Sequence, residues 1–463
     1  MSVFIALAAL FILMIAAYRG YSVILVAPLA ALGAVLLTDP SAVAPAFTNL
    51  FMDKMVGFIK LYFPVFLLGA IFGKLIELSG YSRSIVRAII KILGEKRAIP
   101  VIIAICGLLT YGGVSLFVVV FAVYPFAAEL FRQSNIPKRL MPATIALGGF
   151  TFTMDAMPGS PQIQNIIPTT FFNTTSWAAP TLGIIGSVFI VFTGILYLEY
   201  RRKKAQLAGE GYGEHHKNEP QTPSDIKLAH PLIALLPLLI VGLVNLALTH
   251  YIPHWYPSLF ELQLAGMKES IPVEIQKITA IWAVLGALCS GILCILIFSF
   301  KTIFQQFAEN SKTAIAGAML AAMNTGSEYG FGAIIAALPG FLIVAGSLQG
   351  INNPLLNEAI TINILAGITG SSSGGMSIAL GAMADQFVAA AHAANIPLEV
   401  LHRVASMAAG GMDTLPHNGA IITLLAVTGL THRQAYKDIF SITFIKIAAS
   451  FLIIGVYYLT GWV

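Results

Sequence analysis

Apolar runs of about 20 residues recur along this chain of 463 residues, and they constrain its fold more than any other feature. A helix of roughly 20 apolar residues spans the hydrocarbon core of a bilayer, whereas a membrane barrel uses alternating segments of about 10 residues. Hydrophobic residues make up 57% of the chain, charged residues only 10%, and the mean hydropathy is +0.83. These values exclude a water-soluble domain of this length. The sequence therefore predicts an all-α polytopic membrane protein embedded in a lipid bilayer.

The charges suggest how the chain is divided and oriented. The net charge of +5 is small and scattered, which gives no support for a nucleic-acid partner. Its densest basic cluster, residues 201–204, directly follows an apolar run, and such a cluster usually marks the cytoplasmic side. We expect a first transmembrane half at 1–200, a cytoplasmic polar linker at 201–229 and a second half at 230–463. The cysteines have no metal-ligand spacing, so neither a metal site nor a resident cofactor is expected.

Hydropathy also predicts the individual elements. Residues 38–54 are polar enough to predict a loop with an interfacial piece, and Tyr81 to Arg97 has basic residues at helical spacing, as in an amphipathic helix at the headgroups. A further interfacial region is expected around Trp255 and Tyr256. Transmembrane spans are expected at Ser2 to Ala17, Tyr21 to Leu37, Phe58 to Leu78, His230 to Leu248, Ile278 to Phe300 and Ile439 to Leu459.

A short phrase that occurs twice indicates an internal repeat. Residues 154–158 read Met-Asp-Ala-Met-Pro and residues 412–416 read Met-Asp-Thr-Leu-Pro, so the two aspartates are 413 − 155 = 258 positions apart. An Asn-Ile-Pro triplet precedes each copy, at Asn135 and at Asn395, with an offset of 395 − 135 = 260. The nearly constant offset predicts repeat cores at about 50–170 and 308–430. The spacing alone leaves open whether the two copies are inverted.

Polar and helix-breaking residues interrupt both repeat cores at corresponding places. Backbone that leaves a helix inside a bilayer must be satisfied by protein, water or ligand, so paired breaks in two halves are the best sequence indication of a substrate site. One pair of breaks is Gly112 to Ser115 with Gly370 to Gly374, and a second pair is Asp155 to Gln162 with Asp413 to Asn418. Residues 324–330 are expected to form a further interruption.

The breaks supply candidate substrate-binding residues. Glycine lets the backbone approach a ligand, hydroxyl and amide side chains donate hydrogen bonds, and half-helix N-termini hold a carboxylate through free amides. No Lys or Arg lies within either pair of breaks, which fits an anion held by helix ends and hydroxyls. The candidates are Gly112, Gly113, Ser115, Ser160, Gln162, Ser371, Ser372, Ser373, Thr414, His417 and Asn418.

Three carboxylates are candidates for ion or proton coupling: Asp155, Asp413 and Glu328. Ionisable residues deep in a membrane are costly and are usually functional. Other interpretations remain open, because the glycine and serine breaks are also typical of close helix packing and the two aspartates of N-caps. Glu328 also fits a membrane interface. His417 fits a proton acceptor, a ligand donor or a surface residue.

At these residues the chain resembles the gluconate permease family of bacterial secondary transporters. The segment 151–169, Thr-Phe-Thr-Met-Asp-Ala-Met-Pro-Gly-Ser-Pro-Gln-Ile-Gln-Asn-Ile-Ile-Pro-Thr, is similar to that family's Pro-Gly-x-Pro-Gln-x-x-Asn segment. Residues 370–375 and 415–419 resemble its second-half counterparts, and the resemblance covers nearly the whole chain. It implies a homodimeric permease of the bacterial cytoplasmic (inner) membrane with two inverted repeats, discontinuous helices, re-entrant hairpins, a scaffold and an elevator-type transport domain.

The resemblance also implies a substrate class. Its members import small organic acids, usually by proton symport, but here Tyr111-Gly112-Gly113-Val114-Ser115 replaces the acidic tip expected of a gluconate-type hairpin. This departure favours a smaller hydroxy-monocarboxylate, such as 3-hydroxybutyrate, over a sugar acid such as gluconate. Sodium coupling and an anion channel remain alternatives. An intramembrane serine hydrolase, using residues 371–373 with His392, His402 or His417, lacks the spacing that such an enzyme needs, so no enzyme activity is expected.

Overall fold

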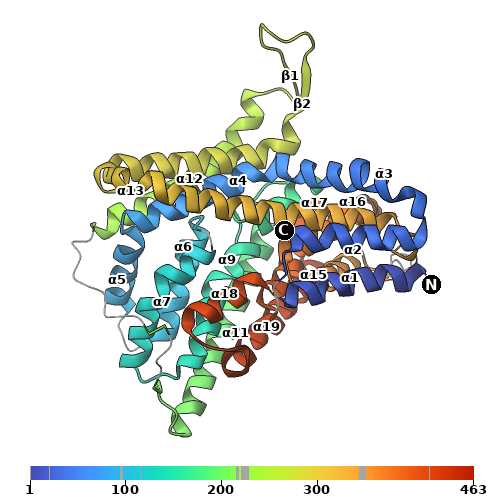
Figure 1. Cartoon of the computed structure of the whole chain (residues 1–463). Helices are drawn as coiled ribbons and strands as arrows, with labels where there is room; N and C mark the ends of the chain where they lie inside the picture. Colours follow the sequence, from blue (N-terminus) through green and yellow to red (C-terminus); the bar gives the residue numbers. More distant parts are fainter. Residues whose placement is uncertain are drawn as a thin grey trace.

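The computed structural model describes residues 2–19, 21–93, 97–114, 116–214, 218–219, 229–341, 343, 351–416 and 418–463. Helices dominate these residues, as the sequence predicts (Figure 1). The first half contains α1 (Ser2–Tyr18), α2 (Val23–Thr38), η1 (Pro40–Ala42), α3 (Val43–Ala46), η2 (Phe47–Phe51), α4 (Met52–Leu78), α5 (Tyr81–Leu93), α6 (Ala98–Tyr111), α7 (Leu116–Gln133), η4 (Lys138–Leu140), α8 (Met141–Gly149), α9 (Phe152–Asp155), α10 (Ile163–Phe172) and α11 (Pro180–Leu207).

The second half follows a similar order after one long apolar helix and a small hairpin. Its elements are α12 (Pro231–Trp255), β1 (Leu259–Leu262), β2 (Ile271–Glu274), α13 (Ile275–Ala337), α15 (Pro354–Thr369), α16 (Ser372–Ala393), α17 (Leu398–Gly410), η5 (Gly411–Thr414), α18 (Gly419–Thr428) and α19 (His432–Thr460). The pair α6 and α7 therefore has a counterpart in α15 and α16, and the pair α8 and α9 in α17 and η5. Inversion of the two copies stays a prediction.

Five helical stretches in the described residues are long and apolar enough to cross a membrane. They are Pro40–Leu78, Pro180–Leu207, Pro231–Trp255, Ile275–Lys301 and His432–Thr460. Large apolar side chains remain exposed on several of them, including Phe192 at 63%, Leu243 at 66% and Ile297 at 76%. Such exposed apolar side chains are typical of helices that face lipid. In a soluble protein other side chains would cover them, and in a membrane the lipid tails do so.

The expected loop at 38–54 is wrong. Helical structure runs from Pro40 through Leu78, in 3-10, α and π geometry. Asp39 stabilises its start, since its side chain accepts a hydrogen bond from the backbone N–H of Ser41 and Pro40 suits a first helical position. The few polar side chains in this stretch did not break the helix, because they are exposed on its surface and need no buried partner.

The expected interruption at 324–330 is also wrong. Residues 275–337 form the helical element α13, whose only non-helical backbone lies at Ser299. Thr325 donates its hydroxyl hydrogen to Ala321 O at 3.1 Å, so this polar side chain is satisfied within the helix.

The sequence analysis did not predict the antiparallel pairing of β1 and β2. This hairpin joins α12 to α13 and projects away from the helices (Figure 1).

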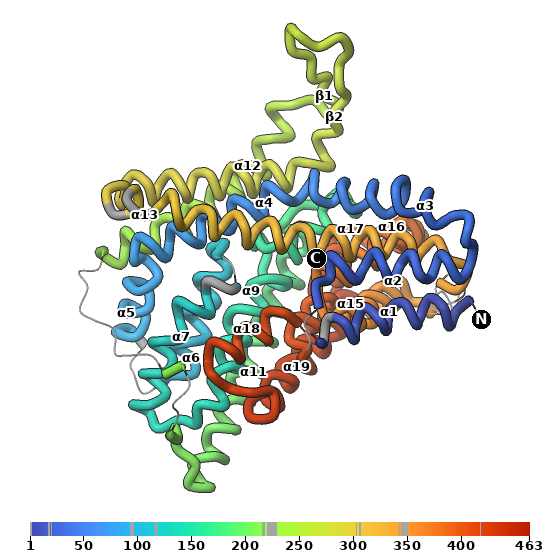
Figure 2. Tube along the Cα trace, viewed as in Figure 1, coloured from blue at the N-terminus to red at the C-terminus, as the bar shows by residue number. Residues whose placement is uncertain are grey.

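Helices α4, α12 and α13 lie side by side over much of their length (Figure 2). Gly291 of α13 permits part of this packing, since a Cβ there would collide with Phe72 of α4 and Val241 of α12. Small residues allow such close approach between helices in a membrane. The discontinuous elements α9, α10, η5 and α17 pack together beside this layer, and they bury the polar side chains of Asp155, Gln164, Asn165, His402, Arg403 and Asp413.

Candidate functional site

Helices end at both predicted pairs of breaks. In the first pair, α6 ends at Tyr111 and α7 begins at Leu116, while α15 ends at Thr369 and α16 begins at Ser372. Gly113 and Gly370 turn these chains with φ angles of 95° and 67°, which favour glycine. In the second pair, α9 ends at Asp155 and η5 ends at Thr414, each shortly before a proline. We call the α6–α7 turn the first tip and the α15–α16 turn the second tip.

Asp413 is the centre of a buried cluster at the second tip. Its Oδ1 accepts a hydrogen bond from the backbone N–H of Ser372 at 3.0 Å, and its Oδ2 accepts one from the Ser372 hydroxyl at 2.6 Å. Asn418 donates to Oδ1 at 3.3 Å and to Gly370 O at 2.8 Å. Asp413 thus binds a helix N-terminus, but that of α16 rather than that of the half-helix following it.

The cluster also joins the two halves of the chain. Gln164, on α10 of the first half, donates its amide to Asp413 Oδ2 at 3.0 Å. The Gln164 Oε1 atom is buried and has no hydrogen-bond partner in the described structure. Asp413 therefore connects a hairpin tip and a half-helix of one half to a half-helix of the other. An acceptor with no protein partner remains beside it.

Glu328 lies against the other side of the second tip. Glu328 lies beside Ser371, and Ser371 caps α16 by accepting from the backbone N–H of Gly374 at 3.1 Å. A Cβ on Gly374 would collide with the Glu328 carboxylate, so the glycine makes room for this acid. Glu328 is 5% exposed and is therefore buried rather than interfacial. Two carboxylates, Asp413 and Glu328, therefore lie beside one helix N-terminus.

Asp155, the first-half counterpart of Asp413, has different partners. Its Oδ2 lies 3.1 Å from Lys446 Nζ of α19, and both side chains are 1% exposed. Lys446 donates its hydrogen bonds to Phe150 O at 2.8 Å and to Gly410 O, so neither Asp155 oxygen accepts one from the described residues. Asp155 is a buried carboxylate that is paired by charge and retains free acceptor positions.

Arg403, on α17, is buried next to Asp155 without a bonded carboxylate. Its guanidinium donates to Ala178 O at 2.7 Å, to Asp155 O at 3.0 Å and to the side-chain oxygen of Asn165 at 3.0 Å. Its neighbour His402 contacts Asn165 at 3.3 Å and the Thr174 hydroxyl at 2.7 Å. These contacts place a fixed positive charge at the first break, satisfied by backbone and amide oxygens.

The first tip is built mainly from backbone contacts. Gln162 donates to Thr110 O at 2.8 Å and to Val114 O at 3.3 Å. A Cβ on Gly112 would collide with Leu238 of α12, so this glycine serves close helix packing. Gly113 also packs beside α13, through Leu288. The first tip is therefore tied to the layer of long helices.

The remaining candidates fall into three groups. Ser160 and Thr414 are buried and bonded locally, since Ser160 donates to Thr153 O at 2.5 Å and Thr414 contacts the Thr443 hydroxyl at 2.7 Å. Ser373 lies 3.4 Å from the Ser371 hydroxyl oxygen and belongs to the second tip. Ser115 and His417 lie outside the described residues.

Sequence reasoning missed Gln164, Arg403 and Lys446. No Lys or Arg lies within the breaks themselves, yet neighbouring helices bring Arg403 and Lys446 there. Lys446 is a lone ionisable residue in an apolar helical run, and Arg403 follows His402 in a buried helix. An ionisable residue inside a membrane helix is itself a signal of function. The five ionisable groups, Asp155, Glu328, Asp413, Arg403 and Lys446, carry a formal net charge of −1 when all are ionised (2 − 3).

A multi-pass helical chain whose broken helices meet at buried charges has the architecture of a membrane transporter. The fold of this chain is also similar to that of a transporter whose structure has been solved. The YdaH transporter of Alcanivorax borkumensis aligns with a TM-score of 0.51 and 14% identity over 92% of this chain and 90% of YdaH. At that identity the likeness shows the fold alone. No family model matches the chain.

A protein relative defines the family more closely. The transporter YxjC of Bacillus subtilis (strain 168), which is uncharacterised, is 57% identical over 472 aligned residues that cover 100% of both chains. The chain belongs to the same family of membrane transporters as YxjC.

Proposed function

We propose that the protein is a secondary active transporter that imports a small organic acid anion by proton symport. The observation that carries the proposal is the position of Asp413, a buried carboxylate that joins the second tip to α10 of the other half. Membrane transporters commonly bind substrate and coupling ion where discontinuous helices of two halves meet. A buried carboxylate at such a junction can take up and release a proton.

The chemistry around the tips suits an anion. The N-termini of α16 and α18 both lie at the breaks, and half-helix N-termini carry partial positive charge and free amides. Arg403 and Lys446 add two buried positive charges nearby. The hydroxyls of residues 371–373 lie beside Asp413, where a substrate hydroxyl or carboxylate would exchange for the hydrogen bonds that they make within the protein. A hydroxy-monocarboxylate, such as 3-hydroxybutyrate or gluconate, offers both groups.

Electrostatics favours binding the anion together with a proton. Glu328 and Asp155 both lie close enough to Asp413 to interact with it electrostatically. With a formal charge of −1 on the buried groups, an entering carboxylate would add like charge in a region of low dielectric. Protonation of one carboxylate offsets this cost. The same oxygens would serve sodium, whose ligands are carbonyls and hydroxyls, so a sodium-coupled symporter is the second candidate.

The resemblance to gluconate permeases extends the proposal. It supports a homodimer in the bacterial inner membrane, two inverted repeats and an elevator movement of the domain that carries the two tips. It also supports a transporter with no enzymatic step. In the described structure, His402 is bonded to Thr174 and Asn165, away from the serines that a hydrolase would require.

The test is uptake of labelled 3-hydroxybutyrate and gluconate into proteoliposomes under an imposed pH gradient and then a sodium gradient. We expect the pH gradient to drive accumulation in the wild type and not in Asp413→Asn. The matched control is Asp385→Asn, which changes an exposed carboxylate on α16 and should transport normally.

Three outcomes would contradict parts of the proposal. Accumulation driven only by sodium would replace proton coupling with sodium coupling. Substrate-dependent flux that never exceeds equilibrium would indicate a channel. No flux of any small organic acid would reject the substrate class.

A further inference from the structure

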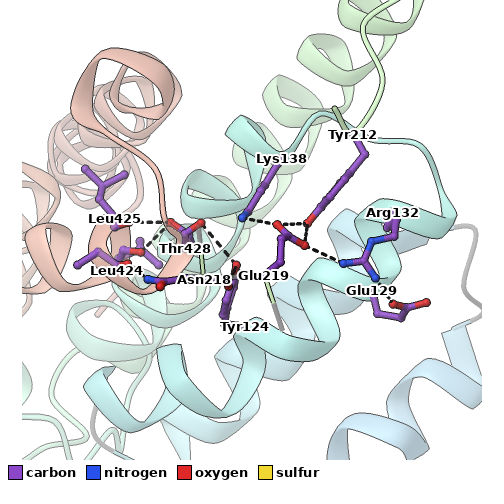
Figure 3. A network of polar contacts seen from close by, with 11 residues as sticks. Tyr124, Glu129, Arg132, Lys138, Tyr212, Asn218, Glu219, Leu424, Leu425 and Thr428 are labelled. Carbon is purple, nitrogen blue, oxygen red and sulfur yellow. Dashed lines mark hydrogen bonds and ion pairs between the residues drawn. The ribbon is translucent and has the colours of Figure 1, made fainter. Parts of the chain in front are cut away.

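Two residues of the linker return to the helices and bind there. Asn218 and Glu219 lie against α7, η4 and α18, and Glu219 points into a group of basic and phenolic side chains (Figure 3). Both residues lie in the segment that separates the two halves of the chain. None of the groups that they contact belongs to the site around Asp413.

The Glu219 carboxylate accepts hydrogen bonds on both oxygens. Lys138 Nζ donates to Oε1 at 2.5 Å, and Arg132 Nη2 donates to Oε2 at 2.7 Å. The Tyr212 hydroxyl lies 3.1 Å from each oxygen. Charge-assisted hydrogen bonds to both oxygens are the geometry by which proteins recognise a carboxylate. These three donors form what we call the linker anion site.

The buried ammonium group of Lys138 requires a negatively charged partner in this site. Its side chain is only 1% exposed, and its ammonium group also lies 5.6 Å from the centre of the Tyr124 ring. A buried ammonium group without a counter-charge is costly. Among the ion pairs of the described residues, Glu219 is the carboxylate that neutralises Lys138. The counter-charge thus comes from the linker rather than from a neighbouring helix.

Asn218 fixes the linker at this position and connects it to the second half. Tyr124 donates its hydroxyl hydrogen to Asn218 O at 2.7 Å, and Asn218 Nδ2 donates to Ala426 O of α18 at 2.7 Å. Asn218 adopts a φ of 55°, in the left-handed region that asparagine tolerates. Both α7 and α18 begin at the breaks described above, so Asn218 connects the middle of α7 to the C-terminal part of α18.

We propose that Lys138, Arg132 and Tyr212 form an exchangeable carboxylate-binding site on the linker side of the protein. Glu219 fills the site from within the chain, and a free small carboxylate fills it when the Glu219 side chain leaves while Tyr212 stays in place. Because a tethered ligand has a high effective concentration, a free carboxylate displaces it only when abundant. The site would therefore respond to organic acid that has accumulated on that side.

The test removes the internal ligand and supplies an external one. Glu219→Ala, purified in detergent, is unfolded thermally in the presence of increasing sodium acetate, with sodium chloride holding the ionic strength constant. We expect its Tm to lie about 2–4 °C below that of the wild type and to recover saturably with millimolar acetate. The wild-type Tm should not respond to the same acetate. Inorganic phosphate, tested in a parallel arm, should restore less.

Two controls separate site binding from general salt effects. Glu219→Ala combined with Lys138→Gln should lose the acetate response. Glu210→Ala removes a linker carboxylate that pairs with Arg139, outside the site, and its Tm should not recover with acetate. If Glu219→Ala does not fold, Glu219→Ser, which also empties the site but keeps a small polar side chain, replaces it.

The proposal is wrong if acetate raises the Tm of all variants equally, if removing Glu219 leaves the Tm unchanged, or if phosphate restores the Tm and acetate does not. Because thermal unfolding requires no transport, its result is independent of the uptake experiment above.

Discussion

At the scale of single residues, two buried serines on α16 differ in whether the side-chain hydroxyl makes a hydrogen bond in the described structure. Ser372 donates to Asp413 through its backbone and its side chain. Ser377 is also fully buried, but its hydroxyl has no hydrogen-bond partner in the described structure. Ser372→Ala should lower the free energy of unfolding by about 1–3 kcal/mol, because a buried charged acceptor loses its donor.

Ser377→Ala provides the matched control for Ser372→Ala. It deletes a hydroxyl without breaking a bond, so stability should stay within roughly 0.5 kcal/mol of the wild type. Thermal unfolding of the two purified variants measures both effects. Equal losses in the two would show that the Asp413 contact adds no more than ordinary helix packing.

Gly410 should tolerate substitution as poorly as Ser372, because it lies against Asp155 of the first break. A Cβ at this position would collide with the Asp155 carboxylate, whereas a Cβ at Gly419 meets nothing within 4 Å. Gly410→Ala should therefore force Asp155 away from Lys446 and cost about 1–3 kcal/mol, as other forms of overpacking do. Gly419→Ala should be nearly neutral. The Tm difference between the variants is the measurement, and an unchanged Tm in Gly410→Ala would contradict this geometry.

The breaks and their carboxylates could be predicted from the sequence, because their residue types violate the apolar pattern around them. Their partners could not. Asp155 and Asp413 occupy equivalent positions in the repeat, yet Asp155 pairs with Lys446 whereas Asp413 accepts hydrogen bonds from Ser372. Which helix brings a cation to a break depends on tertiary packing, and the spacing of residues within the break does not contain that information.

At the scale of elements, the linker contact should depend on pH. Burial alone raises the pKa of Glu219, but hydrogen bonds from Lys138 and Arg132 outweigh it, so its pKa lies below the ordinary value. A lowered pKa in the folded state stabilises the protein above the unfolded-state value of about 4.3, and this contribution is lost as pH falls through the folded-state pKa.

Comparing the Tm of the wild type with that of Glu219→Gln across pH tests this linkage. The difference should be constant from about pH 8 to about pH 5 and should shrink below about pH 4, where the wild-type carboxylate is protonated too. A difference that grows on acidification would mean that Glu219 is not held by cations.

Element boundaries show where hydropathy succeeds and fails. The long apolar helices α12 and α19 are predicted well, because about 20 apolar residues leave few alternatives. The errors lie at 38–54 and 324–330, where polar residues predict a loop and an interruption but the structure is helical. A polar side chain breaks a helix only if it competes for the backbone, and here Thr48 donates back to Ala44 O at 3.1 Å within the helix.

At the scale of the whole molecule, the two halves are held together by polar contacts between buried groups. Gln164 binds Asp413, and Arg403 binds the backbone oxygen of Asp155. A third contact joins Arg139 of the first half to Asp438 of the second at 3.0 Å. Because each contact crosses between halves, a conformational change that separates the halves must break them. Asp413, whose contact between the halves uses its carboxylate, is therefore suited to the proposed coupling of protonation to movement.

The chain order also predicts how the protein sits in the membrane. The linker is followed by the apolar helix α12, 25 residues long, and then by the β1–β2 hairpin. A helix of this length spans a bilayer once, so the linker and the hairpin should lie on opposite sides. A basic cluster such as 201–204 is typical of the cytoplasmic side, so we expect the linker in the cytoplasm and the hairpin outside.

Single cysteines at Glu214 of the linker and at Glu269 between the strands, both exposed, test this topology. The background should carry Cys289→Ala, because Cys289 is the exposed native cysteine among the described residues. A membrane-impermeant maleimide added to intact cells should label Glu269→Cys and leave Glu214→Cys unlabelled until the membrane is broken. The reverse pattern would invert the orientation but keep α12 as a span. Labelling of both positions in intact cells would contradict a single crossing between them.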